Sequence, residues 1–214
     1  MADGTALASD LLPEPLLEAL AGYGGTRAFP AQAILINEGD ETDSLYIVLT
    51  GRVKVYASSE DGREVVLAEH RPGEYFGELA LDGERRSASV KTLEASTCCV
   101  VQRADLQRFL AEHPDFALHL AHKLIRTVRR LTEQVKSLAL QDVYGRIVRV
   151  FSELSDPVGD ERVLRQRLTQ QDIAERVGSS REMVSRVMKD LVAGGYVSVR
   201  DGRHVIHRKL PAAR

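Results

Sequence analysis

Residues 72–90, PGEYFGELALDGERRSASV, carry the most distinctive chemical groups of this chain. Residues 77–80 can start a short helix whose free backbone N–H groups bind an anion. Arg86, eight residues after Glu78, can offer a charged fork to a phosphate, and Ser87 adds a hydroxyl. A carboxylate here would repel the anion, but it fits if Glu78 accepts a hydrogen bond from a ribose 2′-hydroxyl. Together these groups indicate a cyclic ribonucleotide site; on spacing alone, Glu78 and Arg86 could instead form a structural ion pair.

A second group of polar side chains lies near the C-terminus, in TQQDIAERVGSSREMVSRVMKDLVAGG. Ala174, Gly178 and Val184 have the spacing of a helix-turn-helix, which needs a small residue between the helices, a glycine at the turn and an apolar residue inside the second helix. An arginine on the outer face of that helix can donate two hydrogen bonds to a guanine in the major groove. The outer face carries Arg181, Ser185, Arg186 and Lys189. This pattern predicts binding to double-stranded DNA.

Glu182 has two competing roles at the start of the second helix. Ser179 and Glu182 match an S-x-x-E capping box, in which the glutamate only caps the helix. The same carboxylate could accept a hydrogen bond from cytosine N4, and both interpretations stay open.

The elements that position these groups change character along the chain. Residues 11–21 are typical of a short amphipathic helix. Over residues 27–101, short apolar stretches alternate with glycine turns, and Asp61-Gly62 is the strongest hairpin signal. Strands this short, at about ten-residue spacing, favour an antiparallel sandwich or barrel. Residues 141–214 read as a helix, a short strand, two helices and a hairpin with Asp201-Gly202 at its tip.

A long helix is predicted over residues 114–140, which contain no glycine and no proline after the first position. Its apolar residues recur at steps of four and three, the a/d seam of a coiled coil. A seam this narrow favours a two-helix interface over a broad core face, so we expect a homodimer. The seam consists of Ala117, Ala121, Leu124, Val128, Leu131, Val135 and Leu138.

Composition narrows the class of protein further. Residues 139–214 contain 14 Lys and Arg against 10 Asp and Glu, whereas the remainder contains 15 against 21, so the C-terminal part is the basic one. The adjacent Cys98 and Cys99 lie in an apolar run and are expected to be buried strand thiols, since two neighbours cannot form a four-ligand metal site. No apolar run is long enough for a transmembrane helix, and the N-terminus lacks the pattern of a signal peptide, which favours the cytoplasm.

Over residues 33–207 the sequence resembles the catabolite activator (cyclic-AMP receptor) family of the Crp–Fnr group. FGELAL…RRSASV is similar to the family's phosphate-binding cassette, and HPD…LALQDVYGRI to its dimer helix and hinge. The resemblance implies that Glu78 holds the ribose, while Arg86 and Ser87 hold the cyclic phosphate. The full implied ligand site is Gly77, Glu78, Leu79, Ala80, Arg86, Ser87, Ala88, Leu131 and Thr132.

LTQQDIAERVGSSREMVSRVMKDL resembles the DNA-reading unit of the same family. By this resemblance Arg181, Glu182 and Arg186 read bases in a TGTGA-like palindrome, because a symmetric dimer reads symmetric half-sites. The resemblance further implies that Thr169, Gln171 and Ser180 touch phosphates. Ser185 and Lys189, on the outer face of the second helix, complete the predicted DNA-binding residues.

The sequence departs from the family pattern at two places. Leu131 and Thr132 stand where the cyclic-AMP receptors have a Thr-Ser pair that contacts the adenine across both subunits. Loss of one hydroxyl makes cyclic di-GMP, which some relatives use, the alternative ligand. The loop at residues 156–162 is shorter than in enteric members, where it touches RNA polymerase. RNA polymerase is therefore an expected partner whose contact residues cannot be carried over.

The sequence thus predicts an α+β protein in three parts: an N-terminal antiparallel, jelly-roll-like β-roll of the cyclic-nucleotide-binding type (residues 1–112), a long dimerisation helix and hinge (113–140), and a winged helix-turn-helix (141–214). The predicted function is a homodimeric transcription regulator controlled by cyclic AMP. Alternatives are control by cyclic di-GMP, action without a nucleotide, or a nucleotide-binding module that controls a protein partner. An enzyme, a metal site or a bound cofactor is not expected, since no nucleophile–base pair, metal-ligand cluster or P-loop occurs.

Overall fold

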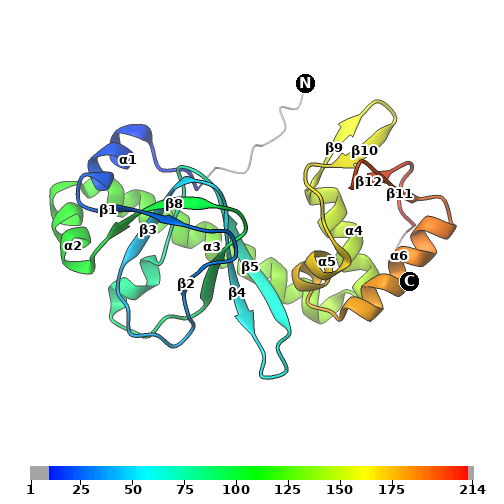
Figure 1. Cartoon of the computed structure of the whole chain (residues 1–214), viewed down its shortest axis with the longest axis horizontal. Helices are drawn as coiled ribbons and strands as arrows, with labels where there is room; N and C mark the ends of the chain where they lie inside the picture. Colours follow the sequence, from blue (N-terminus) through cyan, green and yellow to red (C-terminus); the bar gives the residue numbers. More distant parts are fainter. Residues whose placement is uncertain (1–9, 212–214) are drawn as a thin grey trace. The chain divides into compact units, whose positions relative to one another are not determined.

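The computed structural model describes residues 10–211, which fall into two compact units. The first unit contains the residues up to Ala57 together with Leu67–Arg129, and the second contains Ser58–Val66 together with the residues from Arg130 onward. Figure 1 labels the elements in chain order. The predicted sensor domain of residues 1–112 begins outside the described residues, and the predicted DNA-binding domain of residues 141–214 ends outside them.

Two four-stranded antiparallel sheets form the N-terminal part of the chain, with strand orders β1-β8-β3-β6 and β2-β7-β4-β5. The bounds of its elements are α1 (Glu14–Ala21), β1 (Gly25–Phe29), β2 (Ile34–Ile36), β3 (Leu45–Thr50), β4 (Val53–Ser58), β5 (Glu64–His70), β6 (Tyr75–Phe76), the 3-10 helix η1 (Glu78–Asp82), β7 (Ser89–Thr92), β8 (Ser96–Val101) and α2 (Arg103–Glu112). The predicted antiparallel β-roll is confirmed.

Strand alternation divides the core of this roll into two layers, because successive side chains on a strand point to opposite faces. Val48 on β3 and Cys98 on β8 pack against residues of the other sheet, such as Val90. Their neighbours Ile47 and Cys99 pack instead on the opposite face, among residues of α1, α2 and the long helix. Both thiols are free and buried, as expected from the sequence, and burial raises the pKa of Cys98 to about 11.

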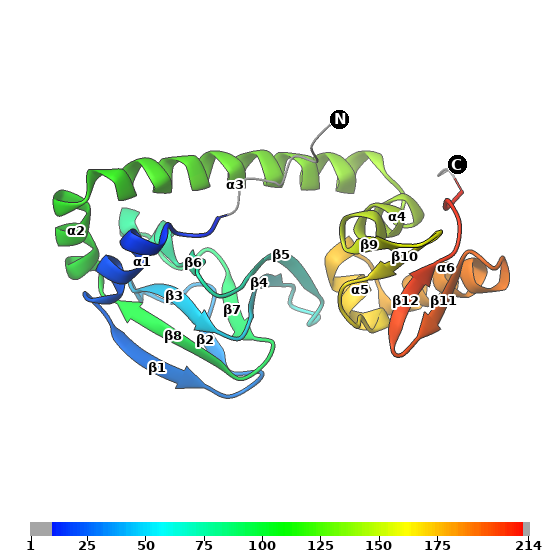
Figure 2. The same ribbon diagram turned by 90° about the horizontal axis from the view of Figure 1, so that it is seen from above.

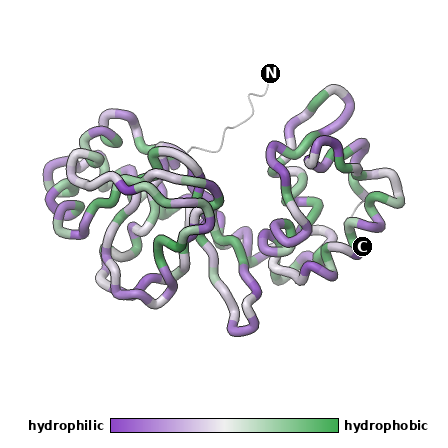
Figure 3. The backbone as a smooth tube through the Cα atoms, viewed as in Figure 1, coloured by the Kyte–Doolittle hydropathy of each residue, from purple (hydrophilic) through white to green (hydrophobic). Residues whose placement is uncertain are grey.

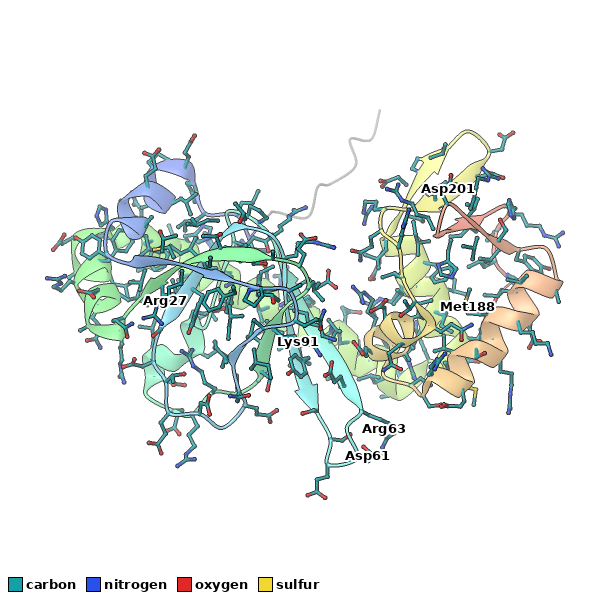
Figure 4. All side chains as sticks on the ribbon, in the orientation of Figure 1. Arg27, Asp61, Arg63, Lys91, Met188 and Asp201 are labelled. Atoms are coloured by element: carbon teal, nitrogen blue, oxygen red, sulfur yellow. The ribbon has the colours of Figure 1, made fainter. Side chains whose placement is uncertain are left out.

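The hairpin between β4 and β5 has the predicted turn. Gly62 has a φ of +79°, and its N–H donates to the Ser59 carbonyl over 2.9 Å. Figure 4 labels Asp61 and Arg63 at this tip, where the guanidinium donates to the carboxylate over 2.8 Å. The tip is hydrophilic in Figure 3, in keeping with its exposed residues.

The helix α3 (Pro114–Leu140) is continuous over 27 residues (Figure 2). Its first turns pack on the roll through Phe116, which is fully buried. The predicted seam remains open along the later turns, where Val128 and Val135 are 63% and 64% exposed in the single chain. Leu131 and Leu138 are exposed as well. In the single chain these residues form an apolar stripe that is open to solvent, and a partner could cover it.

The remaining elements of the second unit are α4 (Val143–Glu153), β9 (Ser155–Val158), β10 (Glu161–Leu164), α5 (Gln170–Val177), α6 (Arg181–Ala193), β11 (Val197–Arg200) and β12 (Arg203–Ile206). Its sheet has the strand order β11-β12-β10-β9. Sequence reasoning had no strand at β9. One apolar cluster joins the three helices to the sheet through Phe151 of α4, Val177 of α5 and Met188 of α6. The winged helix-turn-helix is confirmed.

Helices long and apolar enough to cross a membrane do not occur among residues 10–211.

Candidate ligand site and nucleic-acid interface

A glycine turn leads into the short helix predicted at residues 77–80. Gly77 has a φ of +87°, which favours glycine, and η1 begins at the next residue, Glu78. A Cβ on Gly77 would lie 2.9 Å from Arg86 Nη1 and 2.9 Å from the Ser44 carbonyl oxygen. Gly77 is therefore needed both for the turn and for the close approach of the arginine.

Arg86 is 5% exposed and is held by the roll itself. Its Nε donates to Thr42 Oγ1 over 2.9 Å, Nη1 to the Gly77 carbonyl over 3.1 Å, and Nη2 to the Ser44 carbonyl over 2.6 Å. Burial lowers the pKa of its guanidinium below the ordinary value. These bonds use three of the five N–H donors, so two remain for an anion. Arg86 thus ties the loop at residues 42–44 to the turn before η1.

Glu78 forms its ion pair with a residue of α3 that the sequence analysis did not single out. Its Oε1 lies 2.9 Å from the Nζ of Lys123, on α3. Lys123 is 2% exposed, its ammonium donates to the Tyr75 carbonyl, and its Nζ lies 3.8 Å from the centre of the Tyr75 ring. Burial lowers the pKa of Lys123, and the neighbouring Glu78 carboxylate opposes that shift. The ion pair considered between Glu78 and Arg86 does not form; the partner of Glu78 comes from the helix.

The cluster around Lys123 has further polar groups. The centres of the Tyr75 and His119 rings lie 5.8 Å apart, and the Nε of Arg126 lies 2.7 Å from the Oδ1 of Asp10. Among the residues that the structure describes, the buried Tyr75 hydroxyl and the buried Nε2 of His119 have no hydrogen-bonding partner. The enclosed region around Lys123 is therefore polar.

The other predicted ligand residues have mixed positions. Leu79 and Ser87 are exposed, and Ala88 is half-buried. Ala80 lies in η1, but its side chain is outside what the structure describes. Leu131 and Thr132 are exposed residues of α3 that belong to the second unit, so they are not part of the cluster within the first unit.

Lys123, Tyr75, Thr42 and Ser44 are the residues that sequence reasoning missed. Only Lys123 left a signal: it continues the inward stripe of Phe116 and Leu120 at a step of three. A lysine in such a stripe indicates a buried charge with a partner.

The helix-turn-helix of the second unit has the predicted packing. Ala174 and Val184 are buried, and Gly178 ends α5 in the left-handed conformation, with φ +60°. A Cβ on Gly178 would lie 3.0 Å from Leu138 Cδ2, so the last turns of α3 contact the turn between the two helices. Arg146 reinforces this region by donating to the Val177 carbonyl over 2.7 Å.

Two predicted phosphate contacts cap the helices. Thr169 forms a capping box with Asp172 at the start of α5. The Ser180 hydroxyl accepts a hydrogen bond from the Met183 N–H over 3.2 Å, so the N-cap of α6 is Ser180. The capping box predicted from Ser179 is wrong by one residue, because the helix starts at Arg181, and Glu182 is not needed as a cap.

The outer face of α6 is open. Arg181, Glu182, Arg186 and Lys189 are exposed, and Ser185 is half-buried. Within residues 10–211 none of these four charged side chains forms an ion pair, whereas the Gln171 amide on α5 donates to Glu175 over 3.2 Å. Figure 4 places Met188 on α6 and Asp201 in the turn of the β11–β12 hairpin. The arrangement presents two arginines and a carboxylate side by side on one helix, which suits hydrogen bonding to base edges.

Two families of known proteins match this chain. Residues 26–113 match the family described as the cyclic nucleotide-binding domain. Residues 145–212 match the Crp-like helix-turn-helix domain.

Similar proteins and structures agree with both matches. The cAMP-activated global transcriptional regulator CRP of Salmonella typhimurium is 30% identical over 202 residues, which cover 91% of this chain and 95% of the relative. The CRP-like cAMP-activated global transcriptional regulator of Mycobacterium tuberculosis is 32% identical over 183 residues, covering 83% and 81%. Among solved structures, the c-di-GMP-responsive global regulator CLP of Xanthomonas campestris is 27% identical with a TM-score of 0.83, covering 92% of this chain and 100% of that one.

Proposed function

The chain belongs to the Crp–Fnr family of DNA-binding transcription regulators with a cyclic nucleotide-binding domain, and we propose that it acts as a homodimer controlled by cyclic AMP. The observation that carries the DNA-binding part is the open face of α6, where Arg181, Glu182 and Arg186 have no ion-pair partner among the described residues. Charged side chains left free on a recognition helix can bond to base edges. Acting on DNA, the protein would work in the cytoplasm.

The proposed DNA target is a palindrome with TGTGA-like half-sites. A homodimer with a two-fold axis presents two copies of α6, and these must meet successive major grooves about 34 Å apart. A gel-shift titration with such a palindrome, and with a scrambled duplex of the same length, tests the target. Equal affinity for both duplexes would contradict base reading, and no binding to either would favour control of a protein partner.

The proposed ligand site lies at η1. Glu78 keeps one carboxylate oxygen beyond the one that Lys123 contacts, and it can accept the ribose hydroxyl. Arg86 has two N–H donors left after its bonds to the roll, and the exposed Ser87 can add its hydroxyl for the cyclic phosphate. The contacts of Lys123 with Glu78 and with the Tyr75 carbonyl then connect this site to α3.

Cyclic di-GMP is the second candidate ligand. Leu131 cannot supply the hydroxyl that the family uses for adenine, and the solved structure of the Xanthomonas regulator is of a c-di-GMP-responsive protein. Calorimetric titration with cyclic AMP, cyclic GMP and cyclic di-GMP in separate runs distinguishes them. Micromolar binding of cyclic AMP supports the first proposal, whereas heat with cyclic di-GMP alone would transfer the site to the second ligand. Silence with all three would favour action without a nucleotide.

The proposed mechanism is a population shift between two states of the dimer. A nucleotide at η1 would order α3. The last turns of α3 contact the helix-turn-helix through Leu138, which packs against Gly178. The helix ends at Leu140, and Asp142 caps α4 by accepting from the Gly145 N–H over 2.7 Å, which marks the proposed hinge. RNA polymerase remains the proposed protein partner.

A further inference from the structure

A buried lysine is bound to the proposed ribose-binding carboxylate. We propose that Lys123 positions Glu78 for the sugar hydroxyl of the nucleotide and thereby sets a preference for ribose over deoxyribose. The inference rests on the proposed function, because it concerns the same nucleotide site. It adds a residue of the helix α3 to the determinants of ligand choice.

Lys123 is fixed from three directions. Its ammonium donates to the Tyr75 carbonyl, lies 3.8 Å from the centre of the Tyr75 ring, and lies 2.9 Å from Oε1 of Glu78. Its side chain is 2% exposed, so solvent cannot compete for these contacts. A lysine held in this way is a rigid donor, unlike the flexible lysines of a protein surface.

Glu78 depends on this lysine for its direction. The carboxylate side chain is only 11% exposed, and an enclosed carboxylate without a partner turns toward water. Lys123 contacts Oε1, and the other oxygen stays able to accept hydrogen bonds. An ionised carboxylate held in one direction is a strong acceptor for a hydroxyl.

The arrangement is poorly explained as a stabilising ion pair alone. A buried ion pair costs desolvation, and an apolar pair of the same volume is often as stable or more stable. Glu78 begins η1 directly after the Gly77 turn, beside the guanidinium of Arg86. A charged pair at that place serves ligand recognition better than packing.

The test compares the affinities for cyclic AMP and 2′-deoxy cyclic AMP, measured by calorimetry on the full-length protein. We expect the unchanged protein to prefer the ribonucleotide by about tenfold or more, the value of a hydrogen bond to a charged acceptor. Lys123→Met should reduce this ratio to about twofold or less, because the carboxylate is no longer held in one direction. Lys136→Met is the matched control, since Lys136 lies on the same helix but is 58% exposed.

The ratio separates a positioning role from a structural one. A variant that is only less stable binds both nucleotides more weakly and keeps the ratio. If Lys123→Met does not fold, Lys123→Arg keeps the charge but changes the position of the donor, so it should still lower the ratio below that of the unchanged protein, and an unchanged ratio would overturn the proposal.

Two results would overturn the proposal and are distinguishable. If the unchanged protein prefers the ribonucleotide and Lys123→Met prefers it equally, Lys123 has no part in recognition, while the proposed function stands. If the unchanged protein binds neither nucleotide, the proposed ligand is wrong and the role of Lys123 falls with it.

Discussion

Shortening the apolar stripe of α3 should weaken the proposed homodimer. Val128→Ala with Val135→Ala removes two methyl groups at each position, worth about 1.6 kcal/mol when a side chain goes from water to full burial. These valines are 63% and 64% exposed in the single chain, so about 1 kcal/mol per side chain remains to be gained by contact with a partner. Two valines on each subunit give about 4 kcal/mol per dimer, or about a 1,000-fold rise in Kd.

Sedimentation velocity across a dilution series measures this change directly. The control is Val158→Ala on β9, because Val158 is the same residue type and is 57% exposed, but lies outside α3. Circular dichroism should show equal helix content in all variants, since alanine favours helix at the two α3 positions.

Tight dimers of the double variant, with the Kd of the Val158→Ala control, would refute this reasoning. The stripe would then be covered by something other than a second copy of the chain, and the proposed homodimer interface would have to lie elsewhere.

Three further predictions concern the second unit. Ser180→Ala should cost about 1 kcal/mol of stability by removing the acceptor for the Met183 N–H, measured by chemical denaturation, whereas Ser179→Ala should cost little; equal costs would contradict the capping assignment. Arg181→Ala should cost about 1–3 kcal/mol on the cognate palindrome in gel shifts and relax one base preference, and an equal loss on every duplex would make it a phosphate contact. Burial lowers the pKa of His204 below 6.5, so between 6.5 and the lower folded value the unfolded chain binds a proton at this residue and the folded chain does not. Stability should therefore fall as the pH drops through this range. His204→Gln should flatten the slope of stability against pH in thermal melts, and an unchanged slope would contradict the assignment.

The order and type of the main elements could be predicted because they depend on local spacing. The helix-turn-helix followed from Ala174, Gly178 and Val184, whose roles as contact, turn and core are decided within a few turns of helix. The long helix followed from its seam of apolar residues, and the β-roll from short apolar stretches between glycine turns. Small errors arose where neighbouring residues compete for one role, as Ser179 and Ser180 do for the cap of α6.

The partners of the charged groups in the sensor were decided by the tertiary structure alone. Arg86 bonds to Thr42 and Ser44, more than forty residues earlier in the chain. Glu78 pairs with Lys123 of α3, and the strands β7 and β8 and the helix α2 lie between them in the chain. Spacing along the chain offered Arg86 as a cationic partner for Glu78, and the fold placed Lys123 against it instead.

Local patterns predicted which side chains form the proposed DNA-binding face and the proposed anion site, because helix and strand periodicity assign residues to faces. Only the packed structure decided which charge meets which. A buried ion pair depends on how strands and helices far apart in the sequence come together, and its strength comes from exclusion of water, which no short stretch of sequence specifies.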